Sequence, residues 1–131
     1  MTIFSRIISG EIPCHKIAED ERFFCFLDIR PISKGHCLVV PKVEVDYLFD
    51  LDDATLSEMM RFAKRVAKAV DEATGCLRTG ILVQGLEVPH AHIHLVPLYS
   101  EHTKLAFGAP VSVSSEEMAS IAVAISSRIR L

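Results

Sequence analysis

The chain has 131 residues, of which 50% are hydrophobic and 24% charged, and its formal net charge is −3. That length supports one domain with a single core, and the composition is that of an ordinary soluble globular protein. The net negative charge and the lack of a basic block argue against nucleic-acid binding, but a small anionic substrate is compatible with this charge. No apolar run is long enough to span a membrane.

The first third of the chain predicts a short helix followed by three strands. Thr2 can cap the helix at its start, and Gly10 can end it. A turn at Asp20-Glu21 joins the first two strands as a hairpin, and a loop punctuated by Pro31 and Gly35 leads to the third. The predicted ranges are residues 3–9 for the helix and 15–19, 23–29 and 36–41 for the strands.

The remainder predicts a long helix, two more strands and a last helix. The long helix starts at Asp52-Asp53, has an apolar stripe that includes Met59 and Met60 as core residues, and stops at Gly75. A capping box at residues 114–117 starts the last helix after a loose segment, 101–110. The two strands are predicted at 79–84 and 90–98, with a tight connection at 85–89, and the last helix at 115–130. Short turns between strands favour an antiparallel sheet, so we expect an α+β fold.

No sequence signal indicates export. The first residues contain no signal peptide, and we therefore expect a cytoplasmic protein. Its four cysteines show no CxxC spacing, so we expect them to be reduced thiols: Cys14, Cys25, Cys37 and Cys76. His15 and His102 belong to no motif and are expected at the surface.

Three histidines occupy alternate positions near the end of the chain, His90, His92 and His94. In an extended strand they share one face, while Ala91, Ile93 and Leu95 share the other face and pack on a core. Imidazole can act as a base, an acid, a nucleophile or a metal ligand near neutral pH. The spacing alone leaves three interpretations open, which are a zinc site, nucleophilic catalysis by the middle imidazole, and a structural role.

The stretch from His90 to Val96, His-Ala-His-Ile-His-Leu-Val, resembles the signature of the histidine triad (HIT) family of nucleotide hydrolases and transferases. Residues 3–13, 26–31 and 35–42 also resemble family segments in the expected order. The similarity is strongest to the adenosine-phosphoramidase-like (Hint-like) branch. It implies a single HIT domain over 1–131, with a core at about 2–98 and a C-terminal loop and helix at 99–131. The implied fold is a five-stranded antiparallel sheet with one long helix and short terminal helices.

The resemblance also implies roles for four histidines. His92 would attack the α-phosphate of a nucleotide and form a transient nucleotidyl-histidine, which water then splits. The backbone carbonyl of His90 would hold the other ring nitrogen of His92. His94 would donate a proton or hydrogen bond to the leaving group, and His36 would line the same site. This chemistry needs no metal or cofactor, because the imidazole replaces a metal-activated water.

The implied substrate is a purine nucleotide, joined through its α-phosphate in a phosphoramidate or phosphoanhydride. The carboxylate of Asp28 would accept hydrogen bonds from the ribose hydroxyls, and Gly85 fits the glycine of the family's phosphate loop. Apolar side chains would form the slot for the base: Phe4, Ile7, Ile12, Phe26 and Ile29. The residues alone also allow a plain core role for Phe26 and Ile7, a turn role for Asp28 and a strand-end role for His36. Members of this branch are usually homodimers whose two sheets join, so a homodimer is expected.

Two departures from the family pattern affect these expectations. Ser5 and Ile8 stand where many bacterial relatives carry zinc-binding cysteines, so we expect no structural zinc. Leu86 and Glu87 stand where the family has neutral polar groups that contact phosphate and leaving group. An ionised Glu87 beside a phosphate would be repulsive. This motivates an alternative function, a nucleotide-binding or scaffold protein with weak or no catalysis.

Overall fold

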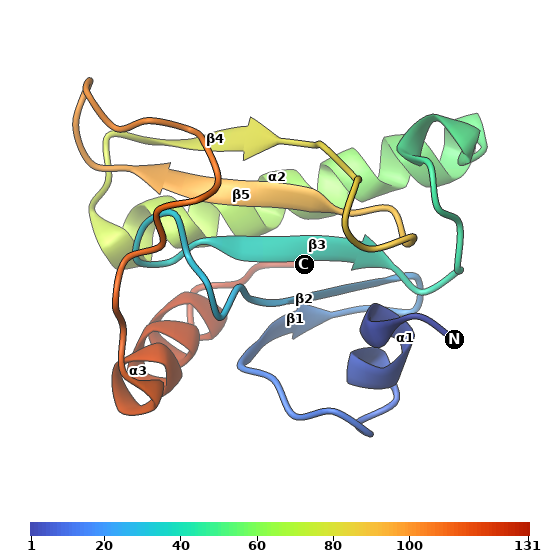
Figure 1. Cartoon of the computed structure of the whole chain (residues 1–131), viewed down its shortest axis with the longest axis horizontal. Coiled ribbons are helices and arrows are strands. Elements are labelled where there is room, and N and C mark those ends of the chain that lie inside the picture. Colours follow the sequence, from blue (N-terminus) through green and yellow to red (C-terminus); the bar gives the residue numbers. More distant parts are fainter.

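The computed structural model describes all residues from 1 to 131 and contains one five-stranded antiparallel sheet with helices on both faces (Figure 1). The strand order is β1-β2-β3-β5-β4, so β1 and β4 form the two free edges. The elements are α1 (Ile3–Ile8), β1 (Lys16–Glu19), β2 (Phe23–Leu27), β3 (Cys37–Pro41), the 3-10 helix η1 (Leu48–Asp50), α2 (Asp53–Thr74), β4 (Arg78–Leu82), β5 (Ile93–Leu98) and α3 (Ser115–Ser126). The predicted α+β class is confirmed.

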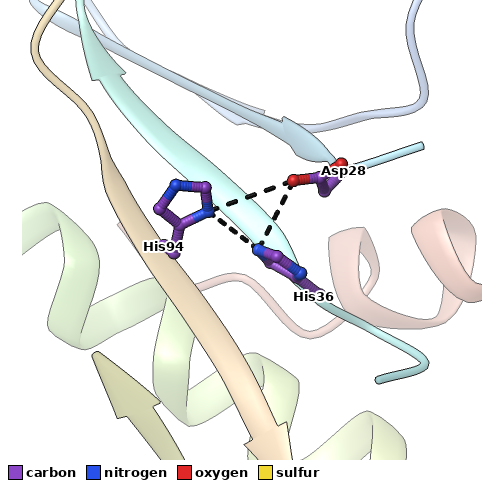
Figure 2. Close-up of side chains that lie close together, drawn as sticks. All are labelled: Asp28, His36 and His94. Carbon is purple, nitrogen blue, oxygen red and sulfur yellow. Dashed lines mark hydrogen bonds and ion pairs between the residues drawn. The ribbon is translucent and has the colours of Figure 1, made fainter. Parts of the chain in front are cut away.

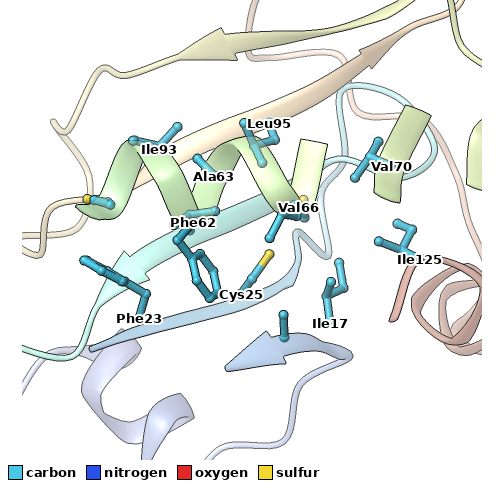
Figure 3. Packing of buried hydrophobic residues seen from close by; sticks show 14 of the residues in the cluster. Ile17, Phe23, Cys25, Phe62, Ala63, Val66, Val70, Ile93, Leu95 and Ile125 are labelled. Atoms are coloured by element: carbon cyan, nitrogen blue, oxygen red, sulfur yellow. The ribbon is translucent and has the colours of Figure 1, made fainter. Parts of the chain in front are cut away.

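The main core lies between one face of the sheet and the helices α2 and α3 (Figure 3). Phe23 and Cys25 of β2 and Ile93 of β5 point to this side and pack with Phe62 and Val66 of α2. Since side chains alternate along a strand, the neighbouring residues face the other way. These residues form a second apolar cluster with α1: Phe4, Phe24, Phe26, Leu38 and Val40.

The long helix starts and stops where the sequence predicts, and both of its ends are capped. The Asp52 side chain accepts a hydrogen bond from the Thr55 amide at 2.6 Å, and Gly75 ends α2 with a φ of 67°, which glycine adopts without steric cost. No helix combines the length and the apolar character needed to cross a bilayer. All four cysteines are free thiols, and Cys25 and Cys37 are buried.

Several predicted bounds were wrong, and one of these errors matters for the site. The strand predicted from His90 begins only at Ile93, because its neighbour β3 ends at Pro41, which has no N–H to continue the ladder. The strand predicted over 79–84 ends at Leu82, and the one predicted over 23–29 ends at Leu27.

The helices also differ from the prediction in detail. The last helix ends at Ser126 instead of residue 130. Just after this end, the Ser127 hydroxyl donates to the Ala124 carbonyl at 3.0 Å and competes with the backbone hydrogen bonds that would continue the helix. The 3-10 helix at Leu48–Asp50 was not predicted. Met59 is fully buried as expected, but Met60 is 43% exposed and is not a core residue.

Candidate active site

A cleft of about 500 Å³ opens on the face of the sheet that carries α1, opposite the main core. Its walls come from α1, from the end of β2 and the loop behind it, and from the loops around residues 84–88 and 107–110. His92 and His94 both lie in its lining. Their shared face follows from alternation, since Ile93 between them belongs to the main core.

His92 has one ring nitrogen occupied and the other free. Its Nδ1 lies 2.7 Å from the backbone carbonyl oxygen of His90. A carbonyl only accepts, so Nδ1 carries the proton and Nε2 keeps its lone pair. Burial lowers the pKa of His92, an effect that the hydrogen bond to His90 and the charges of Asp28 and Glu87 oppose. The side chain is therefore a neutral imidazole at pH 7 with an unprotonated nitrogen available for attack.

His94 and His36 form a hydrogen-bonded pair whose proton positions follow from the surrounding backbone (Figure 2). The amide N–H of Ile32 donates to Nδ1 of His36 at 2.9 Å, so the proton of the neutral His36 ring is on Nε2. That Nε2–H donates to Nδ1 of His94 at 2.9 Å. The proton of His94 is consequently on its own Nε2, which makes this nitrogen a hydrogen-bond donor.

Both rings of this pair are neutral at pH 7. Burial and then repulsion from His92 and His36 lower the pKa of His94 to about 3. Burial also lowers the pKa of His36, against the opposing charge of Asp28. His94 therefore offers a hydrogen bond, and not a ready proton, in the ligand-free site.

Asp28 contributes to both a turn and the histidine pair. Its Oδ1 accepts the Arg30 amide at 2.8 Å, while Oδ2 lies 3.5 Å from Nε2 of His36 and 4.0 Å from Nδ1 of His94. Asp28, His36 and His94 thus place three potential metal-ligand atoms within 4.8 Å of one another (Figure 2). The hydrogen bonds argue against a metal there, because Nε2 of His36 is protonated as long as Nδ1 accepts the Ile32 amide.

His90 does not line the cleft. Its side chain is fully buried, with Nε2 2.7 Å from the carbonyl oxygen of Pro41 and Nδ1 2.7 Å from the hydroxyl of Thr2. Only its backbone carbonyl faces the nucleophile. His36, which was expected to line the site, is fully buried and is not in the cleft lining, and His15 and His102 also lie outside it.

All predicted substrate-binding residues lie in the cleft lining: Phe4, Ile7, Ile12, Phe26, Asp28, Ile29 and Gly85. Phe4 and Phe26 are also members of the second cluster, with ring centroids 5.7 Å apart, so their core and cleft roles coexist. Ile29 is 75% exposed and stands at the rim. The lining agrees with an apolar slot beside two imidazoles.

Other lining residues were not predicted. The ring of Phe107 packs edge to face on His94 with centroids 4.8 Å apart, although Phe107 lies in the segment that looked loose. Cys14 and Arg30 also line the cleft. A single aromatic residue in an aperiodic loop carries no pattern that could have indicated this contact. Leu86 and Glu87, noted as departures, are both in the lining, and Glu87 forms no ion pair.

A family model described as HIT domain matches residues 9–101. The chain is 36% identical over 130 residues to the adenosine 5'-monophosphoramidase hnt1 of Schizosaccharomyces pombe, covering 98% of each chain. It is 39% identical over 109 residues to the adenosine 5'-monophosphoramidase HNT1 of Saccharomyces cerevisiae, covering 82% of this chain and 69% of the relative.

A solved structure resembles the whole fold. The crystal structure of a Hit-like protein involved in cell-cycle regulation from Bartonella henselae superposes with a TM-score of 0.85. The two chains are 27% identical, and the match covers 98% of this chain and 96% of the other. Sequence and fold therefore point to the same group of proteins.

Proposed function

This chain belongs to the HIT domain family, and from that membership we propose that it cleaves purine nucleotides at the α-phosphate, with phosphoramidates or phosphoanhydrides as substrates. The named relatives support a nucleotide hydrolase as the class of reaction. The observation that carries the finer proposal is His92, a neutral imidazole with a free Nε2 in the lining of an apolar cleft.

The proposed reaction has two steps. In the first, the bond between Nε2 of His92 and phosphorus forms while the bond to the leaving nitrogen or oxygen breaks, and the leaving group departs with the electron pair and takes up a proton. In the second, water attacks phosphorus, the bond to Nε2 breaks, and water gives up a proton. The net reaction consumes water and yields a nucleoside monophosphate and the free leaving group.

In this proposal His94 assists by donating to the leaving group, on the other side of the breaking bond from phosphorus. Its Nε2–H is the donor that remains after Nδ1 has accepted His36. A bound phosphate is negatively charged and favours the imidazolium form of His94, which can then pass a proton to the leaving group. The positive charge that develops on His92 during attack is stabilised by the His90 carbonyl.

The apolar part of the cleft fits a purine. Phe4, Phe26 and Ile7 present aromatic and aliphatic surface to it, and burial of a flat ring against such surface is favourable. Oδ2 of Asp28 is the carboxylate oxygen proposed to accept the ribose hydroxyls. Glu87 is an exposed residue of the cleft lining, and in this proposal its charge favours neutral or cationic leaving groups over anionic ones.

Turnover assays with the purified protein test the proposal. Adenosine 5'-monophosphoramidate and a panel of other adenylate conjugates should release adenosine monophosphate, and samples quenched at alkaline pH should show an adenylyl adduct on His92 by mass spectrometry. Nucleotide binding in a calorimeter without turnover or adduct would instead support the binding or scaffold function that Leu86 and Glu87 suggest. Activity that a chelator removes would indicate a zinc hydrolase.

The pH dependence of kcat/KM follows from the lowered pKa of His92. Only the neutral ring attacks, and burial keeps it neutral below the usual pKa of 6.5. We therefore expect kcat/KM to stay on its plateau as the pH falls through 6.5 and to decline only at lower pH. The same buried histidines bind protons more readily in the unfolded chain, so stability must fall with acidification below 6.5. Unfolding measured at each pH keeps the two effects apart, and a half-maximal rate at pH 6.5 with intact fold would contradict the assignment.

We also propose a homodimer in which the free β4 edges of two copies join their sheets. Ile81 on β4 is 48% exposed, and Leu77 and Val83 flank it with exposed apolar side chains. Light scattering should give twice the 14.5 kDa mass of one chain. Ile81→Lys should give the monomer mass, because it places a charge in the apolar contact. Val123→Lys on α3, also at an exposed apolar residue, should remain dimeric.

A further inference from the structure

We propose that Thr2 is a positioning residue of this site, because its hydroxyl fixes the imidazole of His90 and through it the carbonyl that holds His92. The inference rests on the proposed role of His92 as nucleophile and names a residue, remote in sequence, on which that role depends. No motif suggests it, since Thr2 looks like an ordinary helix cap.

The sheet does not hold the peptide that carries this carbonyl. The β3–β5 ladder ends with the pair Val39 and Ile93, so His90 to His92 lie outside it. The N–H of this same peptide, on Ala91, donates to Val45 O at 2.7 Å, and His90 N–H donates to Val88 O at 2.8 Å, so neither amide bonds to β3. The side chain of His90 therefore supplies the connection to β3 that the ladder does not, through Nε2–H and the Pro41 carbonyl at 2.7 Å.

The Thr2 hydroxyl is the partner that stabilises the tautomer making this connection. The Pro41 carbonyl accepts only, so Nε2 of His90 is protonated and Nδ1 needs a donor. The Thr2 hydroxyl, 2.7 Å from Nδ1, is that donor, and the ring is fully buried. Without the hydroxyl, Nδ1 becomes a buried acceptor with no partner. This state favours reorientation of the ring or movement of the ring proton from Nε2 to Nδ1.

Thr2 is itself held in place by its surroundings. The same hydroxyl oxygen accepts the Ser5 amide at 3.1 Å as the N-cap of α1. The carboxylate of Glu44, after β3, accepts hydrogen bonds from the Thr2 amide and, at 2.8 Å, from the Ser5 hydroxyl. One turn of helix is thus tied to both His90 and the loop behind β3.

The same helix also touches the nucleophile directly. The Phe4 ring on α1 packs edge to face on His90 and His92, with centroids 5.7 and 5.0 Å away. The Thr2 contact therefore sets two features of His92 together, the direction of its Nδ1 bond and the wall against which its ring lies. A turned His90 carbonyl would disturb the attack geometry, whereas substrate affinity would fall only if α1 itself moved, because Phe4 and Ile7 of α1 line the base slot.

Thr2→Val tests the proposal, because valine keeps the shape of threonine and lacks the hydroxyl. We expect kcat to fall about 10-fold to 100-fold with KM changed much less, since misplaced reacting groups slow the chemical step. Thr2→Ser keeps the donor and should restore kcat. Ser114→Ala removes the corresponding N-cap of α3, a 3.1 Å bond to the Glu117 amide far from His90, and should leave kcat unchanged.

A second readout does not depend on activity. Nitrogen chemical shifts of the histidine rings in the ligand-free protein should show His90 protonated at Nε2 and His92 protonated at Nδ1. Thr2→Val should change the shifts of both rings, and Thr2→Ser should leave them unchanged. An unchanged pattern and an unchanged kcat in Thr2→Val would overturn the inference. A wild-type protein without turnover, but with these shifts and their change in Thr2→Val, would overturn the proposed function and leave the positioning role standing.

Discussion

Replacement of His92 by alanine or asparagine is expected to lower the release of adenosine monophosphate from an adenosine phosphoramidate by about 10⁴-fold or more. Loss of a covalent nucleophile leaves only the binding and electrostatic contributions of a site, and such losses are among the largest that single substitutions produce. The side chain is buried and neutral, and no other cleft residue replaces its free Nε2, because Nε2 of His94 is protonated and burial raises the pKa of the Cys14 thiol. Steady-state assays and the mass of the quenched protein measure the effect.

The matched control for this substitution is His102→Ala. His102 is exposed and lies outside the cleft, so its loss should change neither the rate nor the adduct. Nucleotide affinity of His92→Ala should stay within a few-fold of the wild type, since the apolar slot is intact. Turnover or adduct formation that persists without the His92 imidazole would refute the assignment of the nucleophile.

The second large effect is expected at His36, where two substitutions separate its two hydrogen bonds. His36→Asn places an amide oxygen near the position of Nδ1 and can still accept the Ile32 amide, but its side chain ends short of His94. Nδ1 of His94 then lacks its donor, and the proton can move to Nδ1, where it faces Oδ2 of Asp28 at 4.0 Å. Nε2 of His94 would no longer be a donor, and we expect kcat to fall about 100-fold or more, since an imidazole held in the wrong tautomer is catalytically impaired.

His36→Gln is the informative counterpart, because its amide nitrogen can occupy the position of Nε2 and still donate to His94. We expect its kcat to stay within about tenfold of the wild type, while the Ile32 amide loses its acceptor and stability falls by about 1–3 kcal/mol. Kinetics and urea unfolding of both variants separate the two effects. Equal loss of kcat in the asparagine and glutamine variants, with both folded, would contradict the proposal that the hydrogen bond from His36 sets the tautomer of His94.

The sequence by itself determined the class of fold and the face on which the chemistry lies. Alternation along a strand separated His92 and His94 from Ile93 and Leu95, and the structure has the same separation, with the last two in the main core. The helical stripe, the start at Asp52-Asp53 and the stop at Gly75 determined α2 nearly to the residue. These features are local, because periodicity and capping depend on residues a few positions apart.

Only the tertiary structure decided the proton positions and the partners that set them. No pattern in the sequence indicates that the Ile32 amide, the Thr2 hydroxyl and the Pro41 carbonyl hold the tautomers of His36 and His90, and the last two act from 88 and 49 positions away. The end of the β3–β5 ladder before His92 likewise depends on Pro41 in another strand. A hydrogen bond between distant segments has no periodic signature in the chain, since it is specified by where the backbone places two groups and not by the spacing of residue types.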